Sequence, residues 1–224
     1  MKPLQVAPSL VEQVHEAILA EIASGKLPPG ARVIQERIAQ ELGISRQPVQ
    51  QALTLLRKQG VLTDAPGRGL QVAPLDLDQV RHMYEVRSVI EGLAFRLAAE
   101  RNAATAAKQG PALIRTGRKA VASGSVGEMI AADMALHEFI YALSGNPMLA
   151  PSMEMHWTNT QRVMGEVLMR DEKPRDIWDQ HEALLEAVAA GDGERAEHLA
   201  RDHILEAAAF MIERLRAERE AQAA

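Results

Sequence analysis

The most constraining feature of this 224-residue sequence is the segment 33–72, whose turn residues divide it into short elements. Apolar residues recur at helical spacing over 35–42, and again over 45–59 after a glycine turn. Ser45 stands where it can cap the second helix, and Pro48 falls in the first turn, where a missing N–H costs little. This pattern predicts two short helices joined by a tight turn.

Residues 61–63 and 70–72 then predict two strands, joined by a glycine-containing loop that carries Arg68. The N-terminal tip of the second helix is polar, with the donor-rich residues Arg46, Gln47, Gln50 and Gln51. Such a helix, apolar behind and donor-rich at its tip, suits the major groove of DNA, and a cation on a hairpin suits a phosphate or the minor groove. The alternative is a small helical domain that binds no DNA.

The remainder of the chain predicts helices only. Aromatic residues make up 3% of the composition and no strand pattern follows residue 72. The fold class we predict is therefore mostly α, with a winged helix-turn-helix in residues 1–74 and an all-helical antiparallel bundle of six helices, or seven, in residues 75–224. The weakest of the six is the second, which Gly110, Pro111 and Gly117 could interrupt. The predicted helices are 77–101, 103–123, 126–144, 148–170, 175–190 and 194–220.

Charge and composition restrict the function further. The net charge is −5, yet residues 1–74 carry 8 Lys and Arg against 6 Asp and Glu, so the positive charge lies with the predicted DNA-binding part. The chain has no cysteine, which excludes disulfides and thiolate metal sites. It has no apolar run near the ~20 residues that span a bilayer, and its start has no apolar signal region. We therefore expect a cytoplasmic protein without a membrane partner.

Four potential metal ligands fall on predicted apolar stripes. Asp133 and His137 lie one turn apart on the third helix of the bundle, His181 lies on the fifth and His203 on the last. Three imidazoles and a carboxylate directed to a common interior make a good site for Zn²⁺, with Ni²⁺, Fe²⁺ or Mn²⁺ as alternatives. Each histidine taken singly could equally be a buried residue of the core.

The N-terminal segment resembles the winged helix-turn-helix of the GntR family of bacterial transcription regulators. This resemblance implies DNA contacts from Arg37, Arg46, Gln47 and Arg68, and we add Ser45 and Gln50 at the same helix tip. The family usually has an Arg-Glu pair where this chain has Gln50-Gln51, and an amide suits adenine better than guanine. The resemblance rests on 27-LPPG-30, Glu36-Arg37, 42-LGISR-46, Pro48-Val49, Ala52-Leu53, Leu56, Gly60 and 67-GRG-69.

The C-terminal segment resembles the FCD ligand-binding domain of the FadR subfamily, and its six predicted helices resemble the shorter, VanR-like branch. The resemblance implies a metal at Asp133, His137, His181 and His203 that helps to hold a small carboxylate effector, with Arg87 as a contact for the effector. A salt bridge between Arg87 and Glu91 is the alternative. The matching residues are Tyr84-Glu85, Arg87, Glu91, Asp133, His137, 144-SGN-146, His181, Ala187, Gly191-Asp192 and His203.

We therefore predict a ligand-responsive transcription regulator, a repressor, that binds a near-palindromic double-stranded DNA operator as a homodimer. A metal-sensing regulator is one alternative, and a metal-dependent enzyme is another. Catalysis is disfavoured because His137-Glu138 and His181-Glu182 begin like the zinc-protease motif HExxH, but Tyr141 and Leu185 occupy the position of its second histidine.

Overall fold

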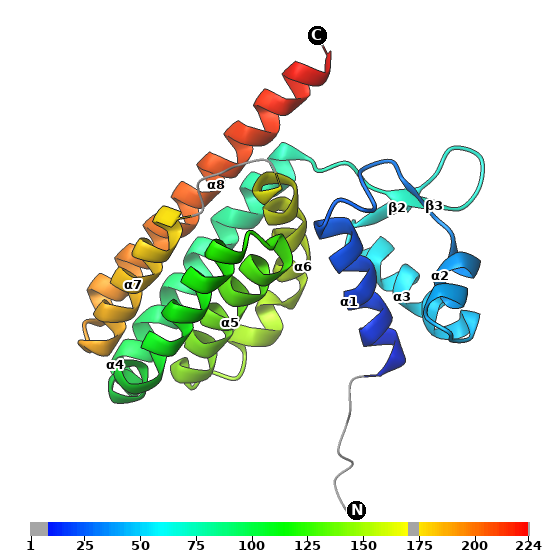
Figure 1. The fold of residues 1–224 in the computed structure, drawn as a ribbon. Helices are drawn as coiled ribbons and strands as arrows, with labels where there is room; N and C mark the ends of the chain where they lie inside the picture. The colour runs from blue at the N-terminus through cyan, green and yellow to red at the C-terminus, as the bar shows by residue number, and fades with distance from the viewer. Residues whose placement is uncertain (1–8, 170–174, 224) are drawn as a thin grey trace, which may run out of the picture. The chain divides into compact units, whose positions relative to one another are not determined.

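The computed structural model describes residues 9–169 and 175–223 of the chain. Contacts divide the chain into two compact units, one that ends at Leu75 and one that begins at Asp76. The fold is mostly helical, with a winged helix-turn-helix followed by a helical bundle, which confirms the predicted fold class (Figure 1). No helix within the described ranges is long and apolar enough to cross a membrane.

The N-terminal unit packs three helices against a small antiparallel sheet. Its core is formed by buried apolar residues such as Ile18, Val49, Leu56 and Val61. The strand order is β1-β3-β2, and the two-residue strand β1 was not predicted because a pair of residues carries no alternation to read. The elements are α1 (Leu10–Ala23), β1 (Arg32–Val33), α2 (Gln35–Glu41), α3 (Arg46–Lys58), β2 (Leu62–Asp64) and β3 (Leu70–Val72).

Ser45 precedes α3 as predicted, but its side chain accepts no hydrogen bond from the first turn. A capping side chain reaches the backbone N–H two or three residues ahead, and the third residue after Ser45 is Pro48, which has no N–H. By contrast, Ser9 at the start of α1 accepts from the N–H of Glu12 and completes a capping box. The Ser45 hydroxyl therefore takes no part in capping its own helix.

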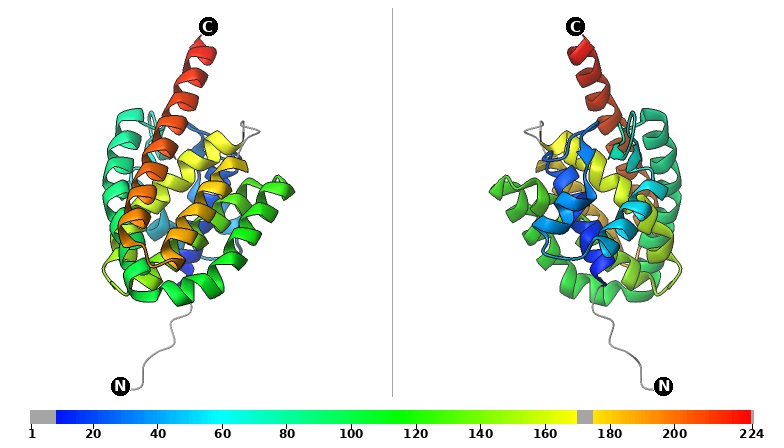
Figure 2. Two further views of the ribbon diagram at one scale, coloured as in Figure 1. Left: turned by 90° about the vertical axis from the view of Figure 1, so that its left-hand side faces the viewer. Right: turned by 90° about the vertical axis from the view of Figure 1, so that its right-hand side faces the viewer.

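The C-terminal unit is a bundle whose consecutive helices run in opposite directions (Figures 1 and 2). Its helices are α4 (Leu77–Ser123), α5 (Val126–Ser144), α6 (Leu149–Leu168), α7 (Arg175–Ala189) and α8 (Gly193–Ala223). Helix α4 changes direction at Asn102, whose backbone is not helical, so it supplies the first two predicted helices. The predicted helix end at Arg170 and the break at Lys173-Pro174 lie outside the described residues.

The second half of α4 runs through Gly110, Pro111 and Gly117 without a break, so the predicted helix 103–123 is confirmed and the possible interruption does not occur. Both glycines face α7 at close range. A Cβ atom added at Gly117 would lie 2.0 Å from the ring of Trp178, and one at Gly110 would lie 2.4 Å from Leu185. These glycines allow close packing of two helices, and the gain in burial offsets their weak helix propensity.

Candidate functional site

The six residues predicted to contact DNA all lie exposed on the N-terminal unit. Ser45, Arg46, Gln47 and Gln50 cluster at the N-terminal end of α3, while Arg37 lies on α2 and Arg68 in the loop between β2 and β3. The opposite side of α3 is buried in the core through Val49, Ala52, Leu53 and Leu56. The helix thus presents a polar tip to solvent and holds its place through its apolar side.

Two of these arginines pair with acidic side chains in the free protein. Arg46 contacts Glu36, and Arg37 donates to Glu41 at 2.7 Å. The side chains of Arg46 and Arg37 are 67% and 75% exposed, and exposed pairs of this kind contribute only about 0–1 kcal/mol. Exchange of these carboxylates for DNA phosphates would therefore cost little.

Arg32 was missed by the sequence analysis because it lies just ahead of the motif. Its guanidinium donates to the backbone carbonyls of Pro66 at 2.7 Å and Arg68 at 3.2 Å. It therefore fixes the loop that carries Arg68 against β1. The sequence offered only an isolated arginine outside the recognised motif.

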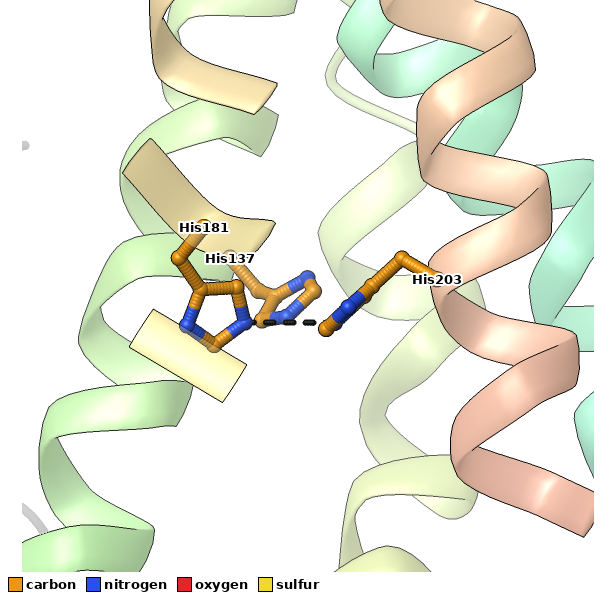
Figure 3. Close-up of side chains that lie close together, drawn as sticks. All are labelled: His137, His181 and His203. Atoms are coloured by element: carbon orange, nitrogen blue, oxygen red, sulfur yellow. Dashed lines mark hydrogen bonds between the residues drawn. The ribbon is translucent and has the colours of Figure 1, made fainter. Parts of the chain in front are cut away.

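The three predicted metal-binding histidines come together in the interior of the bundle. His137 on α5, His181 on α7 and His203 on α8 each offer a ring nitrogen, and these nitrogens all lie within 4.8 Å of one another (Figure 3). The Nε2 atoms of His181 and His203 are 3.2 Å apart. Asp133 lies at the edge of this group, with its Oδ1 3.4 Å from Nε2 of His181. The structure thus brings together all four residues.

Two of these imidazoles, those of His203 and His137, are oriented by partners at Nδ1. Nδ1 of His203 donates to Oε1 of Gln180 at 2.8 Å, and Nδ1 of His137 contacts Oε2 of Glu91. When Nδ1 carries the proton, Nε2 presents its lone pair to the interior. Metal-binding histidines are held in this way by an acceptor on the far nitrogen.

The surroundings keep most of this cluster neutral. Burial, with a smaller contribution from neighbouring imidazoles, lowers the pKa of His203 to about 3 and holds the pKa of His181 well below its ordinary value. Burial would also lower the pKa of His137, but the Glu91 carboxylate beside it outweighs burial and raises the pKa. Burial raises the pKa of Asp133. Neutral imidazoles are the form that binds a metal ion.

Arg87, the predicted effector contact, is buried and already engaged. Its Nε and Nη2 donate to Oε1 of Glu91 at 3.0 and 2.6 Å, and its Nη1 donates to Thr160 at 3.0 Å. The guanidinium also lies over the rings of Tyr84 and Trp157. The salt bridge offered as the alternative is therefore formed.

Glu91 links the arginine to the histidine cluster and was not predicted as a site residue. It is fully buried, and although burial would raise its pKa, His137 and Arg87 together lower it to about 2. One carboxylate thus orients a potential metal ligand and neutralises a buried guanidinium. The spacing of Arg87 and Glu91 on one helix indicated their salt bridge but gave no signal for the contact of Glu91 with His137 on α5.

A cavity of about 370 Å³ opens beside the cluster. Arg87, Asp133, His137 and His203 line one part of it, together with Thr160, while methionine, leucine, isoleucine and phenylalanine side chains line much of the rest. Pockets of roughly 300–1,000 Å³ with a few convergent polar groups are typical of small-molecule sites. The arrangement can therefore accept a small molecule in direct reach of the histidines.

A winged helix-turn-helix unit followed by a helical unit with an internal cavity is the architecture of a class of bacterial regulators. Residues 10–72 match the family of bacterial regulatory proteins called gntR, and residues 82–206 match the FCD domain family. This chain belongs to the GntR family and carries an FCD domain. It is thus a transcriptional regulator, and the expectation that it is not an enzyme is confirmed by its family.

Individual relatives agree with this assignment. A probable D-xylose utilization operon transcriptional repressor of Paenarthrobacter nicotinovorans is 28% identical, over 88% of this chain and 86% of that protein. An HTH-type regulator from an unstable DNA locus of Streptomyces ambofaciens is 30% identical, over 86% and 80%. The solved structure of McbR/YncC of E. coli has the same fold, with a TM-score of 0.81 and 24% identity over 92% of this chain and 99% of that one.

Proposed function

We propose that this regulator binds its operator through the tip of α3 and the loop between β2 and β3. In this proposal Arg46, Gln47 and Gln50 approach base edges in the major groove, and Arg37, Ser45 and Arg68 approach the DNA backbone. Their common exposure and the polar tip of α3 support this role. The Ser45 hydroxyl, which takes no part in capping α3, is available as a donor to a phosphate.

The second part of the proposal is a metal ion, Zn²⁺ first among the divalent ions, at His137, His181, His203 and Asp133. Zinc with bonds of about 2.0–2.1 Å places tetrahedral ligand atoms about 3.3 Å apart. The His181 to His203 separation of 3.2 Å and the His181 to Asp133 separation of 3.4 Å fit this geometry. A bound ion would supply a Lewis acid that attracts a carboxylate.

The effector we propose is a small carboxylate that lies in the cavity against the histidine cluster. The observation that carries this proposal is that the cavity, the histidine cluster and the guanidinium of Arg87 lie side by side. Arg87 would contribute its positive charge from its place beside Glu91, with its orientation fixed by Thr160. Occupation of the cavity would shift the packing of α5, α7 and α8, and the signal would reach the DNA-binding unit.

The active form we propose is a cytoplasmic homodimer that represses its target promoter. Two copies of α3 would read half-sites about one turn of DNA, ~34 Å, apart, so the operator would be a near-palindrome. Repression is supported by the Paenarthrobacter relative, which is named as a probable transcriptional repressor.

The first test is the metal content of the full chain, purified without a metal-affinity tag. We expect about one ion per chain. His181→Ala should remove the ion, while His198→Ala should keep it, because the His198 side chain is 77% exposed and lies outside the cluster. Equal metal content in both variants would contradict the proposed site.

The second test uses the metal-loaded protein bound to its operator. Small carboxylic acids should change operator affinity in the wild type and should have no such effect in His181→Ala. If zinc alone produced the full change in affinity, the protein would be a metal sensor and the carboxylate part of the proposal would fail.

A further inference from the structure

The cavity beside the histidine cluster has most of its polar groups at one end, and apolar side chains follow them, with Glu206 and Arg214 as further charged lining residues on α8. On α6 its lining passes from Thr160, which holds Arg87, to Met164 and then Leu168. On α8 the lining passes from His203 to Ala207 and Met211. Each series advances eight residues, which is about 12 Å at 1.5 Å per residue. The cavity therefore extends away from the histidines along two helices, and its walls become apolar.

The wall formed by α5 also passes from polar to apolar residues. On α5 the lining passes from His137 through Asp133 to Met129. Helix α5 runs opposite to α6, and α8 runs in the same direction as α6 (Figures 1 and 2). All three series thus lead from the histidine cluster to the same end of the bundle. Met129, Met164, Leu168 and Met211 therefore lie towards the same end of the cavity.

We propose that the effector of this protein is a medium-length monocarboxylic acid with an unbranched apolar chain. This inference rests on the proposed effector site and adds the chemical class of the molecule that occupies it. The carboxylate of the acid would lie at the histidine cluster beside Arg87, and its alkyl chain would lie between Met164 and Met211. An extended carbon chain with bonds of about 1.5 Å advances roughly 1.3 Å per carbon, so about eight to ten carbons cover the 12 Å.

The same walls disfavour more polar acids. A hydroxyl or a second carboxylate placed among Met164, Leu168 and Met211 would leave water for a surface of methionine and leucine side chains, where it would find few partners. Glu206 and Arg214 line the cavity as well, and because their charges are opposite, together they add no net charge to this wall. Methionine side chains adapt their shape to an alkyl chain at little cost, so the region tolerates small differences in chain length.

The test measures binding of defined acids to the zinc-loaded full chain by calorimetry. Butyrate, hexanoate, octanoate and decanoate form the length series, and suberate matches octanoate in length but has a second carboxylate. Each methylene buried should tighten the dissociation constant about fourfold, up to eight to ten carbons. Suberate should bind at least tenfold more weakly than octanoate. Equal affinity along the series, or suberate equal to octanoate, would overturn the inference.

A pair of variants tests where the alkyl chain of the acid lies. Met164→Gln places an amide in the apolar part and should weaken octanoate about tenfold while butyrate binding and zinc content stay unchanged. Met148→Gln is the control, because Met148 is 67% exposed and does not line the cavity. Equal octanoate affinity in the two variants would also overturn the inference.

The experiment distinguishes failure of the proposed metal site from failure of the proposed acid class. If the protein bound no zinc, the length series would be measured on the metal-free chain. Length dependence there, with loss in Met164→Gln, would support the acid class and reject the metal. Zinc binding without length dependence would reject the acid class and leave the metal site intact.

Discussion

The histidine cluster depends on side chains that never face its centre. Gln180 accepts the Nδ1 proton of His203, and the Glu91 carboxylate contacts Nδ1 of His137. Because such acceptors set the tautomer and the basicity of the imidazole, they affect metal affinity without direct contact with the ion. Gln180 is the better residue to test, since it is partly exposed, whereas Glu91 also neutralises the buried Arg87.

We expect Gln180→Leu to weaken zinc binding by about 10–100-fold, because His203 loses the acceptor that holds its Nε2 inward. Gln180→Glu should bind zinc at least as tightly as the wild type, since a carboxylate accepts the same proton more strongly. Competition with a fluorescent chelator measures these affinities, and circular dichroism controls for the fold. Three equal affinities would show that Gln180 does not orient His203.

At the DNA-binding surface the residue to test is Arg46. Arg46→Ala should lower operator affinity by about 10–100-fold, the effect of losing a contact worth about 1–3 kcal/mol. The fold should survive because the side chain is 67% exposed. Fluorescence anisotropy on an operator selected from random DNA measures the change, and Arg115→Ala, exposed on the other unit, is the matched control. Full sequence-specific affinity in Arg46→Ala would remove Arg46 from the DNA contacts.

At the scale of elements, the contact between α4 and α7 depends on glycines of α4 that leave room for Trp178 and Leu185 of α7. Gly117→Ala should destabilise the protein by about 1–3 kcal/mol, because the new methyl group meets the Trp178 ring and forces the helices apart. Gly127→Ala, on an exposed face of α5 with nothing within 4 Å, should stabilise it by about 0.4–1 kcal/mol. Urea unfolding measures both. Equal effects would mean that the two helices can separate freely at Gly117.

The same helices show what the sequence can and cannot predict. Periodic apolar stripes and glycine or serine boundaries located the helices closely, because these signals are local. The helix over 103–123 was predicted as well, but the sequence did not show why Gly110 and Gly117 stand in it, because that depends on packing against Trp178 and Leu185, far along the chain. The missing cap at Ser45 was readable in principle, because Pro48 already stood at the position that the cap would reach.

For the candidate site, too, one part could be predicted from the sequence and another could not. The stripes place His137, His181 and His203 on inward faces, so their convergence was predictable once a bundle was assumed. The roles of Glu91 and Gln180 were not, because an acid or amide one turn from other polar residues has many possible partners. Only the packing of α4 against α5 and of α7 against α8 selects among them.

At the scale of the whole molecule, the unfolding temperatures of the two units report separately on what each unit binds. All four proposed metal ligands lie in the unit that begins at Asp76. Zinc at 100 times its dissociation constant adds about 2.7 kcal/mol to the stability of the form that binds it. For a unit of about 150 residues this corresponds to a rise of about 5–11 °C in its unfolding temperature.

We therefore expect zinc to raise the unfolding temperature of the C-terminal unit and to leave that of the N-terminal unit unchanged. Scanning calorimetry with zinc or with a chelator measures both transitions, and His181→Ala should lose the zinc-dependent rise. Operator DNA should raise the N-terminal transition. If zinc shifted both transitions together, the units would unfold as one body, and a signal from the cavity would then reach α3 through shared stability rather than through a change in how the two units are connected.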